Sequence, residues 1–241
     1  MTLSETRSLV AKLNAQLLQS GLAIATNPII PFKIRDRVRL SWPEARNAHG
    51  VFADQHFASL SEYRTFVTGK HYTSLLNEGS LLQISFDFKR NEIVANRFCF
   101  YPCPLEFPEN GYPHDFEAWN DLLETELLSQ IDALAPGWTP PERAESPGTG
   151  GLLRLRSPMR FDFESENRAA AEPTSHVHIN GAGAHIPVHA ALSLRQFIDF
   201  VLSNYYPAHS HLLTEFAPDF CDRSIRPEHE AQLHFDCRRD L

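Results

Sequence analysis

LLQISFDFKRNEIVANRFCFY, residues 81–101, is the stretch of sequence that decides the fold. Apolar and polar residues alternate on both sides of the turn signal Arg90-Asn91-Glu92, and this pattern predicts a β-hairpin. Alternate residues of a strand point to the same side, so the apolar residues form one buried row. This row comprises Leu82, Ile84, Phe86, Phe88, Phe98 and Phe100. The hairpin therefore predicts a sheet with one buried face.

Segments with helical periodicity lie on both sides of the hairpin along the chain. In residues 1–21, Ser4 precedes apolar residues at a spacing near 3.6, and Gly21 ends the pattern. The last predicted helix is capped by Ser193 and closed by Pro207. Three stretches after the first helix are predicted to contain helices: 59–77, where the helix runs into a short extended piece, 116–134 and 192–207.

The predicted fold class is α+β, with a single domain over residues 1–241 built mainly from an antiparallel sheet flanked by helices. Residues 1–60 supply the N-terminal helix and a basic strand. Residues 136–150 are rich in Pro and Gly and are predicted to form a long surface loop, with a domain linker as the alternative. We favour the loop because the strands on either side have too few partners to form separate sheets.

The composition is that of an ordinary globular protein. The 241 residues are 42% hydrophobic and 22% charged, which allows a sizeable core and argues against wholesale disorder. Four cysteines do not form a disulfide framework in a chain of this length. The N-terminal segment lacks the long apolar run of a signal peptide or membrane span. We therefore expect a cytoplasmic protein with no membrane partner.

A basic strip is predicted in FKIRDRVRL, where four cations alternate with mainly apolar residues: Lys33, Arg35, Arg37 and Arg39. On one strand these cations share a face. That face contacts nucleic-acid phosphates in one interpretation, and is the solvated face of an edge strand in the other. Arg154 and Arg156 form a second basic strip. The net charge of −8 disfavours nucleic acid overall without excluding a local basic surface.

The groups best suited to chemistry lie in RFDFE, residues 160–164, and SHVHIN, residues 175–180. Antiparallel pairing of these segments would collect six side chains on one polar face: Arg160, Asp162, Glu164, His176, His178 and Asn180. One or both histidines would serve as general acid or base, with Asp162 orienting an imidazole and Arg160 holding an anionic group. The alternative is an ordinary set of polar cross-strand neighbours.

A metal site is a further interpretation of the same face. His176 and His178, two residues apart on a strand, can both reach one ion, with Asp162, His185 or His189 completing the site. The sequence leaves the metal and any other cofactor open. A separate zinc set in the tail is a weaker alternative, because its spacings match no zinc module: Cys221, His229, His234 and Cys237.

Several familiar motifs do not occur in the sequence. It contains no Walker A, GxGxxG, GxSxG or HExxH motif, which argues against nucleotide-driven motors, dinucleotide enzymes, α/β-hydrolases and zincins. Cys99 and Cys103 do not have the spacing of a redox CxxC pair, so we expect both to be buried as small apolar residues.

Five blocks resemble, in order, an uncharacterised bacterial family catalogued as domain of unknown function 2290. They span roughly the last two-thirds of the chain: GSLLQISFDF with FCFYPCP, SPMRFDFE, PTSHVHING with HIPV, LSLRQFIDFVLSNYYP and SIRPEHEAQLH. The resemblance implies no activity, and the chain departs from the family pattern at His185, where arginine is expected. The matching positions are Arg160, Asp162, Pro173, Ser175, His176, Ile186, Pro187, Val188, Glu228 and His234.

A short region is also similar to toxins of the TumE type, in which an Arg–Asp strand precedes a His-rich segment and which are suspected of acting on RNA. We therefore expect a nuclease-like or nucleic-acid-acting protein of a bacterial toxin or phage-defence system. Acid–base phosphodiester cleavage would use four residues: Arg160, Asp162, His176 and His178. The alternative is a non-catalytic antitoxin, immunity or scaffold subunit that binds a protein encoded by a neighbouring gene. A small-molecule metalloenzyme is the third hypothesis.

Overall fold

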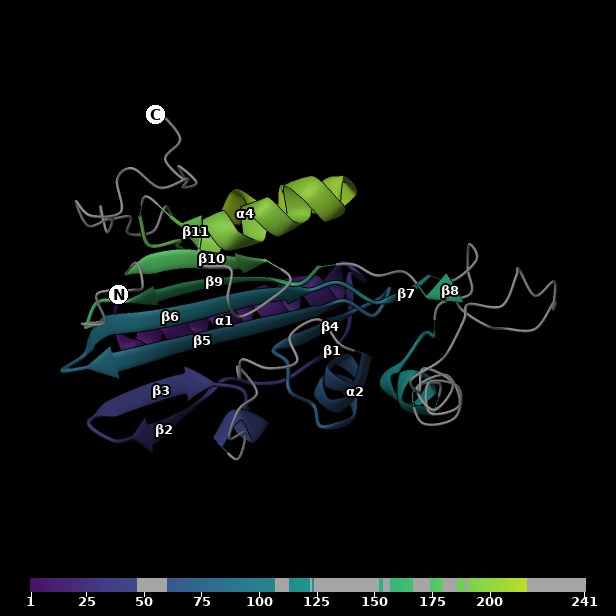
Figure 1. Cartoon of the computed structure of the whole chain (residues 1–241). Coiled ribbons are helices and arrows are strands. Elements are labelled where there is room, and N and C mark those ends of the chain that lie inside the picture. The colour runs from purple at the N-terminus through teal and green to yellow at the C-terminus, as the bar shows by residue number, and fades with distance from the viewer. Residues whose placement is uncertain are drawn as a thin grey trace.

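The computed structural model of the chain describes residues 1–46, 60–106, 113–121, 123, 152–153, 157–166, 174–179, 186–188 and 190–215. A nine-stranded sheet dominates this part of the chain, and its paired strands are antiparallel (Figure 1). The main strand order is β1-β4-β5-β6-β9-β10-β11, and β3 pairs with both β2 and β5. The predicted α+β class with a mainly antiparallel sheet is confirmed.

The strands of the large sheet are β1 (Ala23–Thr26), β2 (Ile30–Ile34), β3 (Arg37–Ser41), β4 (Ser74–Leu76), β5 (Leu81–Lys89), β6 (Glu92–Tyr101), β9 (Met159–Glu164), β10 (Ser175–Ile179) and β11 (Ile186–Pro187). A small second sheet pairs β7 (Leu105–Glu106) with β8 (Leu152–Leu153). The helices are α1 (Leu3–Gln19), α2 (Leu60–Thr68), α4 (Leu194–Tyr205) and two 3-10 segments, η1 (Pro43–Arg46) and η2 (Pro207–Glu215). Residues 116–121 are also helical.

The predicted hairpin is the central pair of strands, β5 and β6. Ile84 lies opposite Phe98 and Leu82 opposite Phe100, as the apolar alternation indicates. The chain reverses at Arg90 and Asn91, which have φ angles of 51° and 68°. Two successive residues with positive φ are the signature of a type I′ turn, whose twist matches that of the flanking strands. The hairpin prediction is confirmed.

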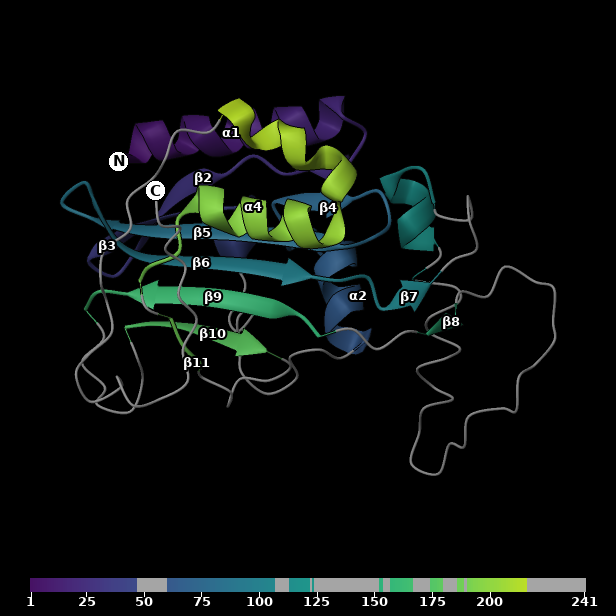
Figure 2. The ribbon, with the colours of Figure 1, turned by 90° about the horizontal axis from the view of Figure 1, so that it is seen from above.

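Helices α1 and α4 cover one face of the sheet. Both run along the strand direction (Figures 1 and 2) and pack into one cluster with the apolar row of the hairpin. Each begins with a capping box, at Thr2 with Glu5 for α1 and at Ser193 with Gln196 for α4. The predicted cap of α4 is confirmed. The first helix begins before Ser4, because Thr2 supplies its cap.

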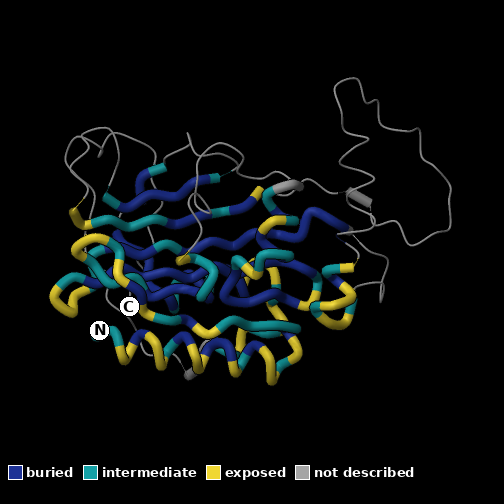
Figure 3. Tube along the Cα trace, turned by 90° about the horizontal axis from the view of Figure 1, so that it is seen from below, coloured by how far each residue is buried: buried dark blue, intermediate teal, exposed yellow. Residues whose placement is uncertain are grey.

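The other face of the sheet has two regions. At the α2 end, aromatic and apolar side chains form a second core, here called the aromatic end: Tyr63, Phe66, Tyr72, Leu81, Tyr101 and Trp119. Farther along the same strands, this face becomes polar, and Gln83, Ser85 and Asp87 of β5 are buried there. Figure 3 shows that the central strands are buried over most of their length, whereas exposed positions follow the outer side of α1 and the turns.

The predicted single basic strand is wrong, because the chain reverses between Ile34 and Arg37 to form the hairpin β2–β3. Lys33 is paired with Val38 and projects from the same face as that residue. Arg37 and Arg39, on either side of Val38, project from the other face. The period-2 spacing of the four cations continues through the turn and concealed it, although Asp36 stands where an apolar residue would continue the strand pattern. Arg35 makes the turn with a φ of 54°, a left-handed conformation that few residues other than glycine adopt.

None of the helices in the described ranges is both long enough and apolar enough to cross a membrane.

Candidate functional site

The registers of β6, β9 and β10 bring polar residues from three strands into adjacent rows. In one row, Arg97 lies opposite Asp162, and Asp162 lies opposite His176. In the next row, Arg160 lies opposite Cys99 on β6 and His178 on β10. Directly opposed residues of antiparallel strands project from the same face. The predicted pairing of RFDFE with SHVHIN is therefore confirmed, and the two strands place four polar side chains together.

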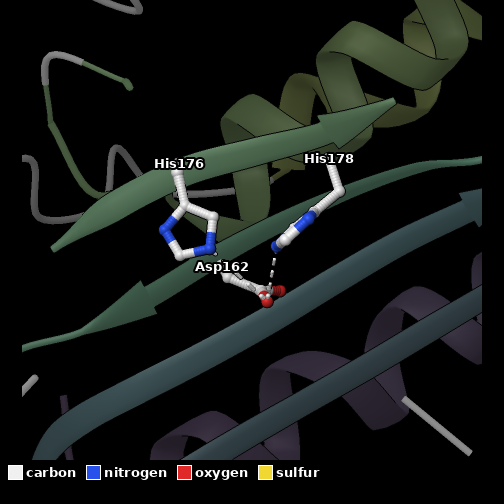
Figure 4. A group of neighbouring side chains, drawn as sticks. All are labelled: Asp162, His176 and His178. Atoms are coloured by element: carbon white, nitrogen blue, oxygen red, sulfur yellow. Dashed lines mark ion pairs between the residues drawn. The ribbon is translucent and has the colours of Figure 1, made fainter. Parts of the chain in front are cut away.

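Asp162 is the centre of this group, which we call the Asp–His cluster: Arg160, Asp162, His176 and His178. Nε of Arg160 lies 3.1 Å from Oδ1 and 3.0 Å from Oδ2 of Asp162, and Nη2 lies 3.0 Å from Oδ2. The Nε2 atoms of His178 and His176 lie 3.5 Å and 4.0 Å from the same Oδ2. Figure 4 shows both rings directed from β10 toward the carboxylate on β9.

The two imidazoles also contact each other. Their ring centroids are 4.7 Å apart and the ring planes meet at 72°, in an edge-to-face arrangement. This packing follows from their spacing of two residues on a strand, which aims both rings at the same side. Each ring therefore has a fixed neighbour on one side and the Asp162 carboxylate ahead of it.

The Asp–His cluster is largely withdrawn from solvent. Arg160, His176 and His178 are buried, and the side chain of Asp162 is 12% exposed. Burial by itself would raise the pKa of Asp162, but the contact with His178 and the positive charges of Arg160 and Arg97 outweigh it. The pKa of Asp162 consequently lies well below its ordinary value, and the residue is a carboxylate at neutral pH.

The predicted basic strip does not form a continuous surface. Arg39 donates two hydrogen bonds to Asp87, from Nε at 2.6 Å and Nη2 at 2.7 Å. Arg37 forms ion pairs with Glu164 at 2.8 Å and Glu166 at 2.7 Å. Arg39 therefore joins β3 to Asp87 of β5, and Arg37 joins β3 to the last residue of β9, Glu164, and to Glu166 just beyond it. Lys33 and Arg35 are exposed.

Several predicted residues lie outside the part of the chain that the structure describes. They include the second basic strip, Arg154 and Arg156, the loop 136–150 and the further metal ligands His185 and His189. Asn180 and the Cys2His2 set of the tail also lie outside it. The placement of all these groups stays a prediction.

Arg97 is the residue of the site that the sequence interpretation did not include. Arg97 of β6 is paired with Asp162 of β9, and its positive charge helps to lower the pKa of that residue. The signal was present in NRFCF, where Arg97 and Cys99 alternate with the two buried phenylalanines. Cys99 itself is buried, as predicted, and burial raises the pKa of its thiol, so it is a poor nucleophile.

The fold and the cluster define an α+β protein with a buried Arg–Asp–His centre on one face of an antiparallel sheet. The chain matches the family described as "Uncharacterized conserved protein (DUF2290)" over residues 22–237, and it belongs to that family. The match begins at residue 22, so the family extends well beyond the blocks recognised in the sequence. No curated protein and no solved structure matches the chain.

Proposed function

We propose that this protein is a nuclease-like enzyme of a bacterial toxin or phage-defence system, which cleaves phosphodiester bonds by acid–base chemistry at the Asp–His cluster. One observation carries the proposal: a single ionised carboxylate, Asp162, lies within 4.0 Å of two imidazole nitrogens and within hydrogen-bond distance of an arginine. Phosphodiester cleavage needs a base, an acid and a positive group for the phosphoryl oxygens, and the cluster supplies these three types of group.

The two histidines divide the proton transfers in this proposal. One imidazole removes the proton from the attacking hydroxyl or water, and a new P–O bond forms. The P–O bond to the leaving oxygen breaks, and the other imidazole donates a proton to that oxygen. Asp162 keeps both rings oriented and stabilises whichever imidazole is positively charged.

In this proposal, Arg160 and Arg97 allow a protein with a negative net charge to bind an anionic substrate. The chain has a net charge of −8, but two guanidinium groups neighbour the single carboxylate of the cluster. A local excess of positive charge in a partly desolvated site attracts phosphate far more strongly than the same charges in bulk water. Arg160 holds a phosphoryl oxygen in this proposal, while its Nε keeps Asp162 in place.

The test is cleavage of total RNA and plasmid DNA by the wild-type protein and by His176→Ala and His178→Ala. His114 is exposed, so His114→Ala is the matched control. General acid–base groups contribute about 10²–10⁴-fold in rate, so each cluster variant should lose activity by this factor and the control should lose none. Full cleavage by His176→Ala would contradict the proposal.

A thermal melt of each variant separates loss of chemistry from loss of folding, because the two histidines are buried. If neither the wild-type protein nor any variant cleaves nucleic acid across divalent metals, the proposal fails. In that case the alternative is a non-catalytic subunit, and co-purification with the product of a neighbouring gene would support it.

A further inference from the structure

The same three side chains that support acid–base chemistry have the arrangement of metal ligands. Asp162, His176 and His178 each offer one ligand atom, and these atoms all lie within 4.8 Å of one another. We infer that the Asp–His cluster binds one divalent ion of the zinc class, and that the ion inhibits cleavage. The inhibition rests on the proposed function, whereas the binding site rests on geometry alone.

The distances suit a small ion with nitrogen and oxygen ligands. Zinc lies about 2.0–2.2 Å from such atoms, so neighbouring ligands in a tetrahedral or octahedral shell are about 3.0–3.5 Å apart. Oδ2 of Asp162 lies 3.5 Å from Nε2 of His178 and 4.0 Å from Nε2 of His176 (Figure 4). The distance to His178 lies within this range, whereas the ligand atom of His176 has to move closer when an ion binds.

The backbone fixes these ligands before an ion arrives. Two of them come from alternate residues of β10, and the third comes from the position of β9 directly opposite His176. Arg160 donates to both carboxylate oxygens, which orients Asp162 in the way that outer hydrogen bonds orient metal ligands. A carboxylate has about four lone-pair sites, so these hydrogen bonds leave room for an ion.

The ligand set selects the class of ion. Two imidazoles and one carboxylate favour Zn²⁺, Co²⁺ and similar transition ions over Mg²⁺ or Ca²⁺, which prefer oxygen ligands. Three protein groups are brought together within the described residues, and the predicted further ligands His185 and His189 lie outside these residues.

Metal binding and proton transfer exclude each other at this site. An imidazole nitrogen bound to zinc has no lone pair left to accept a proton, and Asp162 cannot orient the rings while it also binds the ion. Zinc should therefore inhibit the cleavage proposed for this cluster, and removal of zinc by a chelator should leave the activity intact or raise it.

The binding test is titration of the tag-free, metal-free full chain with Co²⁺, followed by visible absorption, with zinc content after dialysis as a second measurement. We expect one ion per chain, with the spectrum of a nitrogen- and oxygen-ligated site. His178→Ala and Asp162→Asn should each weaken binding by more than about 100-fold, because outer-shell changes alone typically cost 10–100-fold. His114→Ala should bind like the wild type.

A further double variant keeps this test decisive. Cys221→Ser with Cys237→Ser removes the alternative ligand set of the tail and should leave binding unchanged. No bound ion in the wild-type protein, or equal binding by His178→Ala and Asp162→Asn, would overturn the metal site. Melting curves show whether a variant that fails to bind is still folded.

The inhibition test is cleavage of RNA with EDTA and with stoichiometric Zn²⁺. Activity with EDTA that zinc suppresses supports the inference, and stimulation by zinc overturns it in favour of a metalloenzyme. Metal-free cleavage that His176→Ala loses, in a protein that binds no Co²⁺, would leave the proposed function standing and reject the metal site. Tight Co²⁺ binding without cleavage under any condition would support the metal site and reject the proposed function.

Discussion

The aromatic end and the Asp–His cluster lie on the same face of the sheet and are both buried, but different interactions hold their side chains: aromatic packing in the first region and ion pairing in the second. At the aromatic end, the Phe66 and Tyr101 rings meet edge to face with centroids 5.5 Å apart. In the Asp–His cluster, buried charges meet instead, and Arg160 neutralises Asp162. Along β6, the change from one region to the other takes place between Tyr101 and Arg97.

If the proposed function holds, this difference separates the residues that stabilise the fold from the residues that carry out the chemistry. Burial of aromatic rings is among the largest favourable contributions to folding. Burial of a charge pair removes both groups from water, and the mutual attraction roughly offsets that loss rather than exceeding it. A buried polar cluster within an otherwise apolar core is thus weak support for stability, and such departures from the core pattern are expected at functional sites.

The largest effect on stability is expected at the aromatic end. Phe66→Ala should lower the free energy of unfolding by about 3–5 kcal/mol, because it removes a buried ring and leaves a cavity. Urea denaturation measures this change. Cleavage per folded molecule should stay at the wild-type level, since Phe66 does not belong to the Asp–His cluster. A loss below about 1 kcal/mol would mean that the aromatic end is not a packed core.

Breaking the ion pair should have a somewhat smaller effect. Arg160→Met leaves the Asp162 carboxylate buried without its main counter-charge, while Arg97 and His178 still compensate in part. We expect a loss of about 3 kcal/mol in the free energy of unfolding, again by urea denaturation. No destabilisation would show that solvent reaches the Asp162 carboxylate freely.

A loss of about 1 kcal/mol is expected from Ser193→Ala. The Ser193 hydroxyl accepts a hydrogen bond from the backbone of Gln196, and its removal leaves a helix N–H without that partner. α4 packs on the opposite face of the sheet through Phe197, which contacts Phe161 of β9. The variant therefore weakens the support behind β9 without changing any group of the cluster, and its rate of cleavage should not change.

The smallest effect is a change of stability with pH that depends on His71, whose ring lies next to that of Phe66 at the aromatic end. Burial lowers the pKa of His71 below its ordinary value, although the charge of Glu44 opposes the shift. The unfolded chain therefore binds the His71 proton more readily than the folded chain. Stability should fall as the pH decreases through about 6.5, the ordinary histidine pKa, and should be independent of His71 above it. His71→Gln should flatten this part of the stability–pH curve, and an unchanged slope would contradict the assignment.

Much of the fold was predictable because local patterns and tertiary structure agree. The hairpin of β5 and β6, the capped helix α4 and the pairing of β9 with β10 each follow from alternation, turn residues or caps. The grouping of Asp162, His176 and His178 was predictable for the same reason, since the strand period fixes which side chains share a face.

One error is local, and two omissions come from contacts between segments far apart in the chain. The reversal at Arg35 was missed because the four cations keep their spacing of two through it, and a single polar residue, Asp36, does not by itself distinguish a turn from a strand. The pairing of β3 with β5, which gives Arg39 its partner Asp87, depends on strand order in the whole sheet. Arg97 was overlooked because the register between β6 and β9, rather than any motif, brings it to Asp162.

The most direct test replaces both charges of the ion pair, in the variant Arg160→Met with Asp162→Leu. Apolar replacements of a buried pair are often neutral or stabilising, so the double variant should melt at or above the wild-type temperature and recover the loss seen in Arg160→Met alone. It should cleave neither RNA nor DNA. A stable double variant without activity supports a cluster that serves chemistry, whereas a stable double variant with full cleavage would contradict this account.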